Sequence, residues 1–438
     1  MKKLIETIRN IFKIEELRKR IIYTLLLILV YRLGSFVVMP GINPNMIADS
    51  DLTAQTSEGL LGLLNMFSGG AFGNASIFAL GVMPYISASI VLQLLGIMVP
   101  YFQKLQKEGE SGRRKMNQWT RYLTIVILAI QGPAYLTNLH AQLPADAFLI
   151  KGTSFNIFAT LVLIGGTMFI MWLGERITDR GIGNGISLII MIGIVARLPH
   201  ALVAEIGTRM SASVGGPLML IVEFILLFVV FALTIALVQG TRKIPVQYAK
   251  RIVGNKQYGG VRQYIPLKIN AANVMPIIFA QALMMFPLLF SQFDATRGFA
   301  ATFSDVKGFW YNAVFAFLII IFTYFYTTVI INPTQMADDM KKNGGFIPGV
   351  KPGKNTAEYI DSVMSRITLP GSIFLAIVGI LPALAMIVGV NNQFAQFYGG
   401  TSLLIMVGVV LDTLQQIESH LLMRHYDGLT KTGRLKGR

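Results

Sequence analysis

The side chains that could carry out chemistry are few, and they form no known catalytic pattern. The sequence has no cysteine and four histidines. His420 and His425 are five residues apart, a poor spacing for metal ligands on one helix, and they flank the cation Arg424. The glycine-rich run 181–185 lacks the Lys-Ser/Thr pair of a phosphate loop, and no metalloprotease, nucleophile-elbow or dinucleotide motif is found. These observations disfavour an enzyme, and we expect no metal or cofactor.

Polar groups inside apolar stretches are the next candidates. Three of these groups are ionisable, namely Arg32, Glu223 and Asp412. Intramembrane charges often mark an ion or substrate route, because each costs about 2.5–3.5 kcal/mol at a helix centre. We expect Arg32 and Glu223 to snorkel toward an interface, while Asp412 lies near the inner end of its stretch. An ion-coupled transporter would normally have more such groups. The isolated polar residues, for which inter-helix hydrogen bonding is the plainest role, are Ser87, Gln93, Gln131 and Asn270.

The composition indicates which elements must position these residues. Only 14% of the 438 residues are charged, against about 25% in soluble domains, and 53% are hydrophobic. The mean hydropathy is +0.59. So few charges cannot cover the surfaces of soluble domains. High apolar content and the lack of cysteine also exclude disordered and disulfide-stapled chains. The sequence therefore predicts an integral membrane protein.

Ten stretches are long and apolar enough to cross a bilayer, which needs roughly 17–25 residues per helix. The first stretch follows a basic segment but has no signal-peptidase site, so we interpret it as a retained span. An even number of spans places both termini on one side. The predicted spans are residues 21–39, 76–99, 122–139, 155–173, 182–198, 217–238, 274–290, 310–331, 369–390 and 401–417.

The loop charges predict the orientation of these spans. The two termini and the loops on their side carry 32 of the 38 lysines and arginines, which gives that face a net charge of about +19. By the positive-inside rule this face and both termini are cytoplasmic. Lys151, Arg209, Arg297 and Lys307 are assigned to the opposite loops, and Arg197, next to the last residue of the stretch 182–198, is counted with them. Ten spans divide into two sets of five, and an odd number per set makes the second set begin on the opposite side of the membrane, as in an inverted repeat. Ten unrelated helices would fit as well.

Three loops stand out from the rest. Residues 59–73 are apolar but too short to span, so they form either a re-entrant, cavity-filling segment or an interfacial helix. Residues 240–269 contain two extended runs around a glycine-rich turn, with seven basic and no acidic residues. This loop could meet RNA phosphates or an acidic protein, or it could be basic only because cytoplasmic loops are. The loop 332–368 is long and rich in glycine, proline and lysine. Long structured loops often carry function.

Long motifs in these regions resemble the SecY family of protein-conducting channels. They are MFSGGAFGNASIFALGVMPYISASI at 66–90, KEGESGRRK at 107–115, MWLGERITDRGIGNGIS at 171–187, GGTSLLI at 399–405 and the loop 332–361. The resemblance implies an all-α membrane protein whose ten helices form two inverted five-helix halves, a clamshell around a central pore. The expected parts are a cytoplasmic amphipathic segment 1–20, a first half 21–198 that includes a plug at 59–73, an external hinge loop 199–216, a second half 217–417 and a basic cytoplasmic tail 418–438.

The resemblance also implies roles for particular residues. The pore ring is expected at Val82, Ile86, Ile186, Ile190, Ile278 and Ile405, where isoleucine is more usual at the position of Val82. The plug residues are Leu64, Met66, Phe67, Gly69, Gly70 and Gly73. The lateral gate is expected at Ser87, Gln131, Asn270 and Phe286. Cytoplasmic docking is expected at Arg242, Lys243, Lys250, Arg251 and Lys351, the last standing where the family usually has arginine, whose planar fork lysine lacks.

The same resemblance implies partners and a location. The partners would be the subunits SecE and SecG, the motor ATPase SecA, the ribosome through its RNA, signal sequences with nascent chains, and membrane lipid. The location would be the bacterial inner membrane. A small-solute secondary transporter is the alternative, but it should have charged or ion-liganding residues at mid-membrane. An intramembrane enzyme ranks third, because no catalytic constellation is found.

Overall fold

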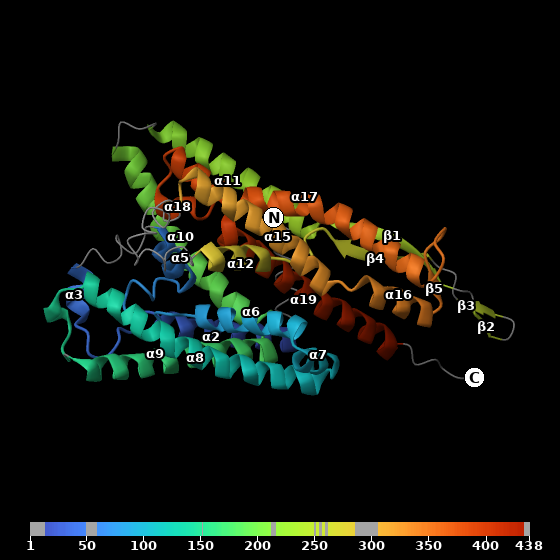
Figure 1. Cartoon of the computed structure of the whole chain (residues 1–438), viewed down its shortest axis with the longest axis horizontal. Helices are drawn as coiled ribbons and strands as arrows, with labels where there is room; N and C mark the ends of the chain where they lie inside the picture. Colours follow the sequence, from blue (N-terminus) through green and yellow to red (C-terminus); the bar gives the residue numbers. More distant parts are fainter. Residues whose placement is uncertain are drawn as a thin grey trace. The chain divides into compact units, whose positions relative to one another are not determined.

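The computed structural model describes residues 14–49, 59–150, 152–211, 216–248, 251–253, 256–258, 262–284 and 305–432. Long helices dominate, and five short strands accompany them (Figure 1). The chain divides into two compact units. Unit 1 comprises Met1–Ala204 with Gly408–Arg438, and unit 2 comprises Glu205–Val407.

The regular elements of unit 1, among the described residues, are helices. They are α2 (Glu15–Gly34), α3 (Pro44–Asp49), α5 (Gly59–Phe67), α6 (Met83–Met98), α7 (Pro100–Lys107), α8 (Glu110–Gln142) and α9 (Thr153–Arg180), with a 3-10 turn at Ala145–Ala147. Two long helices, α10 (Gly185–Ser211) and α19 (Gly400–Thr432), continue from one unit into the other.

Unit 2 combines long helices with all of the described strands. Its helices are α11 (Gly216–Gln239), α12 (Met275–Met284), α15 (Phe309–Ile330), α16 (Pro333–Lys342), α17 (Lys354–Ile387) and α18 (Asn392–Ala395). Its strands are β1 (Thr241–Tyr248), β2 (Arg251–Val253), β3 (Lys256–Tyr258), β4 (Arg262–Lys268) and β5 (Gly345–Phe346).

Seven described helices are long and apolar enough to cross a bilayer, namely α8, α9, α10, α11, α15, α17 and α19, the stretch at α15 running on through α16. An eighth span results if α6 and α7, which bend by 103° at their break, count as one. The prediction of a mostly helical, multi-pass membrane protein is confirmed. The two remaining predicted spans, 21–39 and 274–290, fall on α2 and α12 and overlap them in part, and the exact count of ten stays a prediction.

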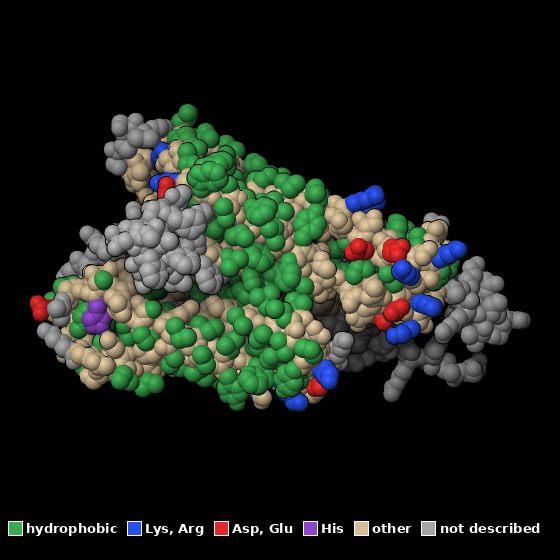
Figure 2. All heavy atoms as spheres, viewed as in Figure 1, with side chains coloured by type: hydrophobic (Ala, Val, Ile, Leu, Met, Phe, Trp, Pro, Cys, Tyr) green, Lys and Arg blue, Asp and Glu red, His purple; other side chains and the backbone are tan. Residues whose placement is uncertain are grey.

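Hydrophobic side chains are widespread on the face shown in Figure 2, and many large ones on the long helices are exposed. Leu25 on α2, Phe228 on α11 and Phe317 on α15 are 59%, 75% and 62% exposed. In water such surfaces would associate, because large exposed apolar patches are unfavourable there. Facing lipid they carry no such penalty, so the exposed residues agree with a bilayer environment.

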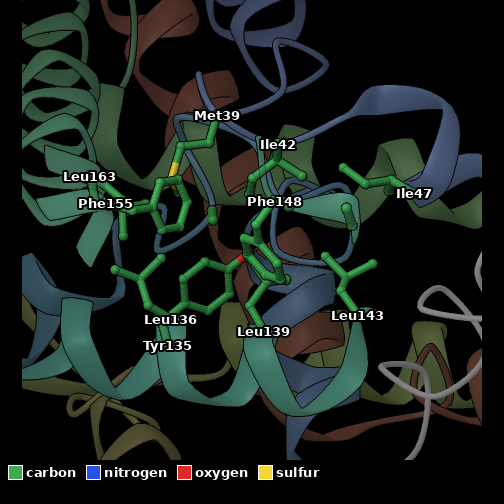
Figure 3. Close-up of a cluster of buried hydrophobic side chains, with 14 of the residues drawn as sticks. Met39, Ile42, Ile47, Tyr135, Leu136, Leu139, Leu143, Phe148, Phe155 and Leu163 are labelled. Atoms are coloured by element: carbon green, nitrogen blue, oxygen red, sulfur yellow. The ribbon is translucent and has the colours of Figure 1, made fainter. Parts of the chain in front are cut away.

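The core of unit 1 is an apolar cluster contributed mainly by α8, α9 and the segments around them (Figure 3). Leu136, Phe155 and Leu163 are each about 1% exposed. The ring of His140 stacks on Phe148 with centroids 4.1 Å apart, while its Nδ1 lies 2.7 Å from the carbonyl oxygen of Leu136. His140 is exposed, so these two contacts fix its ring at the edge of the cluster.

The predicted hinge loop 199–216 is mostly helical, because α10 continues through Pro199 to Ser211. Arg209, assigned to a loop by sequence, lies buried in this helix. Its Nε donates to Glu205 Oε1 at 2.9 Å, its Nη2 donates to the carbonyl of Gly389 at 2.9 Å, and it also pairs with Glu223. Glu223 is 4% exposed and does not snorkel, which corrects the prediction. A cation among carboxylates is the arrangement that a low-dielectric interior favours over an isolated charge.

We expect Arg209→Met to destabilise the protein by about 3–5 kcal/mol, because it leaves Glu205 and Glu223 buried without their cation. Denaturant unfolding in detergent micelles measures the loss. Lys19→Met is the matched control, since Lys19 pairs with Glu15 at 2.8 Å with both side chains largely exposed. Exposed pairs contribute at most about 1 kcal/mol. Equal effects of the two variants would contradict the role of the buried cluster.

Candidate functional site

An irregular segment, residues 68–82, links α5 to α6 inside unit 1. Its conformation depends on left-handed backbone angles, including φ of +66° at Gly69 and +94° at Gly70. Glycine adopts these angles without the clash that a Cβ brings. Turns continue to residue 82, so α6 begins at Met83 and not at residue 76 as predicted.

Hydrogen bonds from within the segment and from neighbouring helices satisfy its backbone. Asn65 Oδ1 accepts from the Gly73 amide at 3.0 Å. The hydroxyl of Tyr31, on α2, donates to the Ser68 carbonyl at 3.2 Å. The hydroxyl of Tyr135, on α8, donates to the Phe72 carbonyl at 2.9 Å. Buried backbone that is not helical needs such partners where no water reaches.

Two arginines also donate to this region, one to the segment and one to Asn65 on α5. Arg32 Nη1 on α2 lies 3.0 Å from the Gly69 carbonyl, and Arg197 Nη2 on α10 lies 2.9 Å from Asn65 Oδ1. Arg32 was predicted to snorkel, but its guanidinium instead turns onto the segment, with its carbon 5.1 Å from the Phe36 ring centroid. Arg197, assigned to a loop by sequence, lies within α10. Sequence reasoning also missed Asn65, Tyr31 and Tyr135, because nothing in their spacing indicates a shared target.

The predicted plug residues lie together in α5 and this segment. Met66 and Phe67 are 4% and 7% exposed, Leu64 is half-buried, and Gly69, Gly70 and Gly73 are buried. An interfacial helix would keep one face in water. The described side chains between 64 and 73 are all buried or half-buried, which favours the cavity-filling alternative.

Four predicted ring positions belong to unit 1, where Val82 ends the segment and the other three lie on α6 and α10. Val82 is the N-cap residue of α6, and Ile86 follows one turn later. The neighbouring Gly81 approaches Ser68 so closely that an added Cβ would lie 3.4 Å from the Ser68 Cβ. Ile186 and Ile190 share a face of α10 with Gly193 and Arg197, at spacings of 4, 3 and 4 residues.

That face of α10 contacts the segment directly. A Cβ added at Gly69 would lie 2.9 Å from Gly193 Cα, and Arg197 bonds to Asn65. Ile190 therefore stands about one helical turn from the segment. The side chain of Ile190 is 7% exposed, and Ile186 is half-buried.

The other two ring positions belong to unit 2. Ile278 is half-buried on α12, and Ile405 is 6% exposed on α19. Thr401 Oγ1 lies 3.4 Å from Gln281 Oε1. Since Gln281 is three residues after Ile278, and Thr401 is four before Ile405, this contact joins the two helix faces that carry the predicted ring residues.

The predicted gate residues are distributed over both units. Ser87 is half-buried on α6 and Gln131 is exposed on α8, both in unit 1. Asn270, in unit 2, is 3% exposed, and its Oδ1 has no hydrogen-bond partner among the described residues. Phe286 lies outside the described residues, so the gate stays a prediction.

The loops 240–269 and 332–368 form one small subdomain in unit 2. β1 pairs antiparallel with β4 from Thr241–Lys268 to Gln247–Arg262, which confirms the predicted extended runs, and β5 from the loop 332–368 pairs with the end of β1. β2 pairs with β3 nearer the tip. The subdomain has its own apolar core, made of Ile244, Val246, Leu267, Met340, Ile347, Ile360 and Met364.

Three of the predicted docking cations, Arg242, Lys243 and Lys351, are exposed. Along β1 the buried Ile244 and Val246 alternate with the exposed Lys243 and Pro245. Arg251 begins β2, and Lys250 lies outside the described residues. Lysine, arginine, aspartate and glutamate side chains gather over this part of unit 2 (Figure 2).

Comparison with known proteins matches residues 76–414 to the SecY family model. The chain is 46% identical over 440 residues to the protein translocase subunit SecY of Halalkalibacterium halodurans, covering 98% of this chain and 100% of the relative. It is 42% identical over 437 residues to that of Streptomyces scabiei, covering 96% and 98%.

Solved structures show the same fold at low sequence identity. A protein-conducting channel aligns with a TM-score of 0.60 and 16% identity, covering 96% of this chain and 95% of its own. Sec61 from a canine ribosome-channel complex of the endoplasmic reticulum aligns with a TM-score of 0.55 and 16% identity, over the same shares of each chain.

We expect Gly70→Ala to destabilise the protein by at least about 1–2 kcal/mol, since φ of +94° is unfavourable for alanine and the added Cβ would lie 2.8 Å from Arg197 Nη2. Gly165→Ala is the control, because Gly165 lies within α9 and a Cβ there meets nothing within 4 Å. That substitution should stabilise by about 0.5–1 kcal/mol. Denaturant unfolding in detergent measures both. A Gly70→Ala variant as stable as the wild type would disprove the close approach.

Proposed function

The chain belongs to the SecY family, and from this premise we propose how its parts serve a protein-conducting channel. Members of the family are translocase subunits and not enzymes, so this multi-pass membrane protein conducts polypeptides. The alternative of a small-solute transporter finds no support. The roles below are the proposal.

The six ring residues form the constriction through which the polypeptide passes. An apolar ring offers no partner to an ion or a chain of water, so it seals by dewetting. Branched aliphatic side chains can still part around an extended chain. The support is that Ile186 and Ile190 occupy the same face of α10 as the contacts to segment 68–82, and that Val82 and Ile86 begin α6 beside it.

Residues 59–73 act as the plug beneath this ring. The observation that carries the proposal is a buried, non-helical turn inside a bundle of membrane helices, held by side chains of α2, α8 and α10. Non-helical backbone at membrane depth occurs where it is enclosed by protein or lines an aqueous path. In a solved SecY relative, the plug domain stabilises the closed state of the translocation channel and maintains a membrane seal.

The lateral gate releases hydrophobic helices into lipid. It uses Ser87, Gln131, Asn270 and Phe286, in a channel of two inverted halves, 21–198 and 217–417, hinged at 199–216. The buried, unpartnered Asn270 Oδ1 among the described residues supports a polar role there. A segment leaves sideways when lipid is favourable, since a central Leu, Ile or Phe gains about 0.3–0.6 kcal/mol while Asp, Lys or Arg loses about 2.5–3.5 kcal/mol.

The strand subdomain docks cytoplasmic partners. Arg242, Lys243, Lys250, Arg251 and Lys351 contact ribosomal RNA or the acidic surface of the SecA motor, which supplies the energy that the channel itself does not. Exposure of the three described cations supports this role, and Sec61 and Ssh1 relatives were solved in ribosome complexes. SecE and SecG complete the complex, in the bacterial inner membrane with both termini cytoplasmic.

Ring substitutions should break the resting seal. We expect Ile278→Asn or Ile405→Asn to raise ion conductance of the resting channel in planar bilayers, because an amide lets water wet the ring. Ile157→Asn is the matched control, since Ile157 is 62% exposed on α9 and is not a ring position. Unchanged resting conductance in both ring variants would exclude the assigned ring.

A covalent cross-link across the proposed gate should block the release of hydrophobic helices into lipid. The chain has no cysteine, so Ser87→Cys with Phe286→Cys can be cross-linked selectively. The cross-linked channel should stop releasing hydrophobic helices into lipid, measured by lipid cross-linking of an arrested substrate, while each single-cysteine variant releases them normally. Release at the wild-type rate from the tethered channel would show that the gate lies elsewhere.

A further inference from the structure

Two arginines from different helices converge on the same turn of the proposed plug. Arg32 on α2 donates to the Gly69 carbonyl at 3.0 Å, and Arg197 on α10 donates to Asn65 Oδ1 at 2.9 Å. Asn65 Oδ1 in turn accepts from the Gly73 amide at 3.0 Å, which closes the turn. The plug turn is defined as residues 65–73. The side-chain oxygen of Asn65 links the two ends of this turn to each other and, through Arg197, to α10.

The turn is shaped to receive these side chains. A Cβ added at Gly69 would lie 2.9 Å from Arg32 Nη1. A Cβ added at Gly70 would lie 2.8–2.9 Å from Nη2, Cζ and Nε of Arg197, so this guanidinium presents its flat side to the Gly70 Cα. The two glycines therefore do more than allow positive φ, because their missing side chains also make room for the two cations.

The charges make this contact reversible. Among the described residues, neither Arg32 nor Arg197 forms an ion pair, and both donate instead to neutral oxygens. The two guanidinium groups lie against the adjacent glycines Gly69 and Gly70, so their like charges repel each other. Hydrogen bonds from charged donors hold the turn more strongly than neutral ones, while the repulsion opposes the closed arrangement. The hydrogen bonds thus favour the closed turn, while the repulsion lowers the free energy needed to open it.

We propose that Arg32 and Arg197 are positioning residues that hold the plug turn closed at rest, and that opening requires their hydrogen bonds to Gly69 and Asn65 to break. This inference rests on the proposed role of residues 59–73 as the plug. The face of α10 that carries Arg197 also carries the ring positions Ile186 and Ile190, so a chain that parts the ring acts on the helix that holds the turn.

Resting conductance of the purified complex in planar bilayers tests the proposal. Arg197→Met and Arg32→Met keep most of the apolar stem but remove the donors, so the open fraction at rest should rise roughly 10- to 100-fold. Arg197→Lys should leak less than Arg197→Met, because lysine keeps the charge and a donor while losing the flat fork. Arg176→Met is the control, since Arg176 on α9 lies over the Trp172 ring and not on the turn. Its resting conductance should match that of the wild type.

A disulfide distinguishes this inference from the plug role on which it rests. The added Cβ of Gly81 would lie 3.4 Å from the Ser68 Cβ, near disulfide range, so Ser68→Cys with Gly81→Cys can lock the turn under oxidation. Oxidation should stop translocation and reduction should restore it. Translocation through the fully locked channel would overturn the plug role. Suppose that the disulfide blocks transport, but Arg32→Met and Arg197→Met show wild-type resting conductance, or Arg176→Met leaks as much as they do. The plug role then stands, and the proposal that the two arginines hold the turn closed is wrong.

Discussion

The structure depends on satisfying the polar backbone of a non-helical turn that is buried in a membrane protein. Helices α6, α8 and α10 satisfy their own backbone, but residues 68–82 cannot. Tyr31, Arg32 and Tyr135 supply the missing donors from two helices. This requirement fixes which helices surround the turn, and with them the placement of the ring positions on α6 and α10.

The proposed channel combines two different physical barriers. The proposed ring is apolar and would exclude water because it offers no hydrogen bonds, so its seal would recover when the passing chain leaves. The turn is held by directional hydrogen bonds, which are specific in geometry and are either made or broken. An apolar ring alone adapts to a chain of varied side chains, while the polar contacts define one closed position. The combination suits a channel that must exclude ions at rest and admit polypeptides of varied side chains during translocation.

The apolar stretches and the extended runs of 240–269 were predictable, because each depends on local pattern. Local pattern left residues 59–73 open between a cavity-filling segment and an interfacial helix. Prediction failed where distant residues compete with that pattern. Residues 76–82 are apolar enough for a helix, but the turn bonds and positive φ at Gly81 delay α6 to Met83. Residues 199–211 contain a proline and two charges, yet α10 persists, because Glu205 and Arg209 pair along the helix and meet Glu223.

By itself the sequence determined the membrane environment, the charge asymmetry of the two faces and the resemblance that identifies the family, since these follow from composition, periodicity and motif. Only the tertiary structure decided the targets of Arg32 and Arg197, the burial of Glu223 and the partners of Asn65. A charged side chain within an apolar stretch has several low-energy options, such as snorkelling, an ion pair or a carbonyl oxygen. The groups that fold nearby select among them, and residues 65, 69 and 197 meet through helix packing that no local pattern encodes.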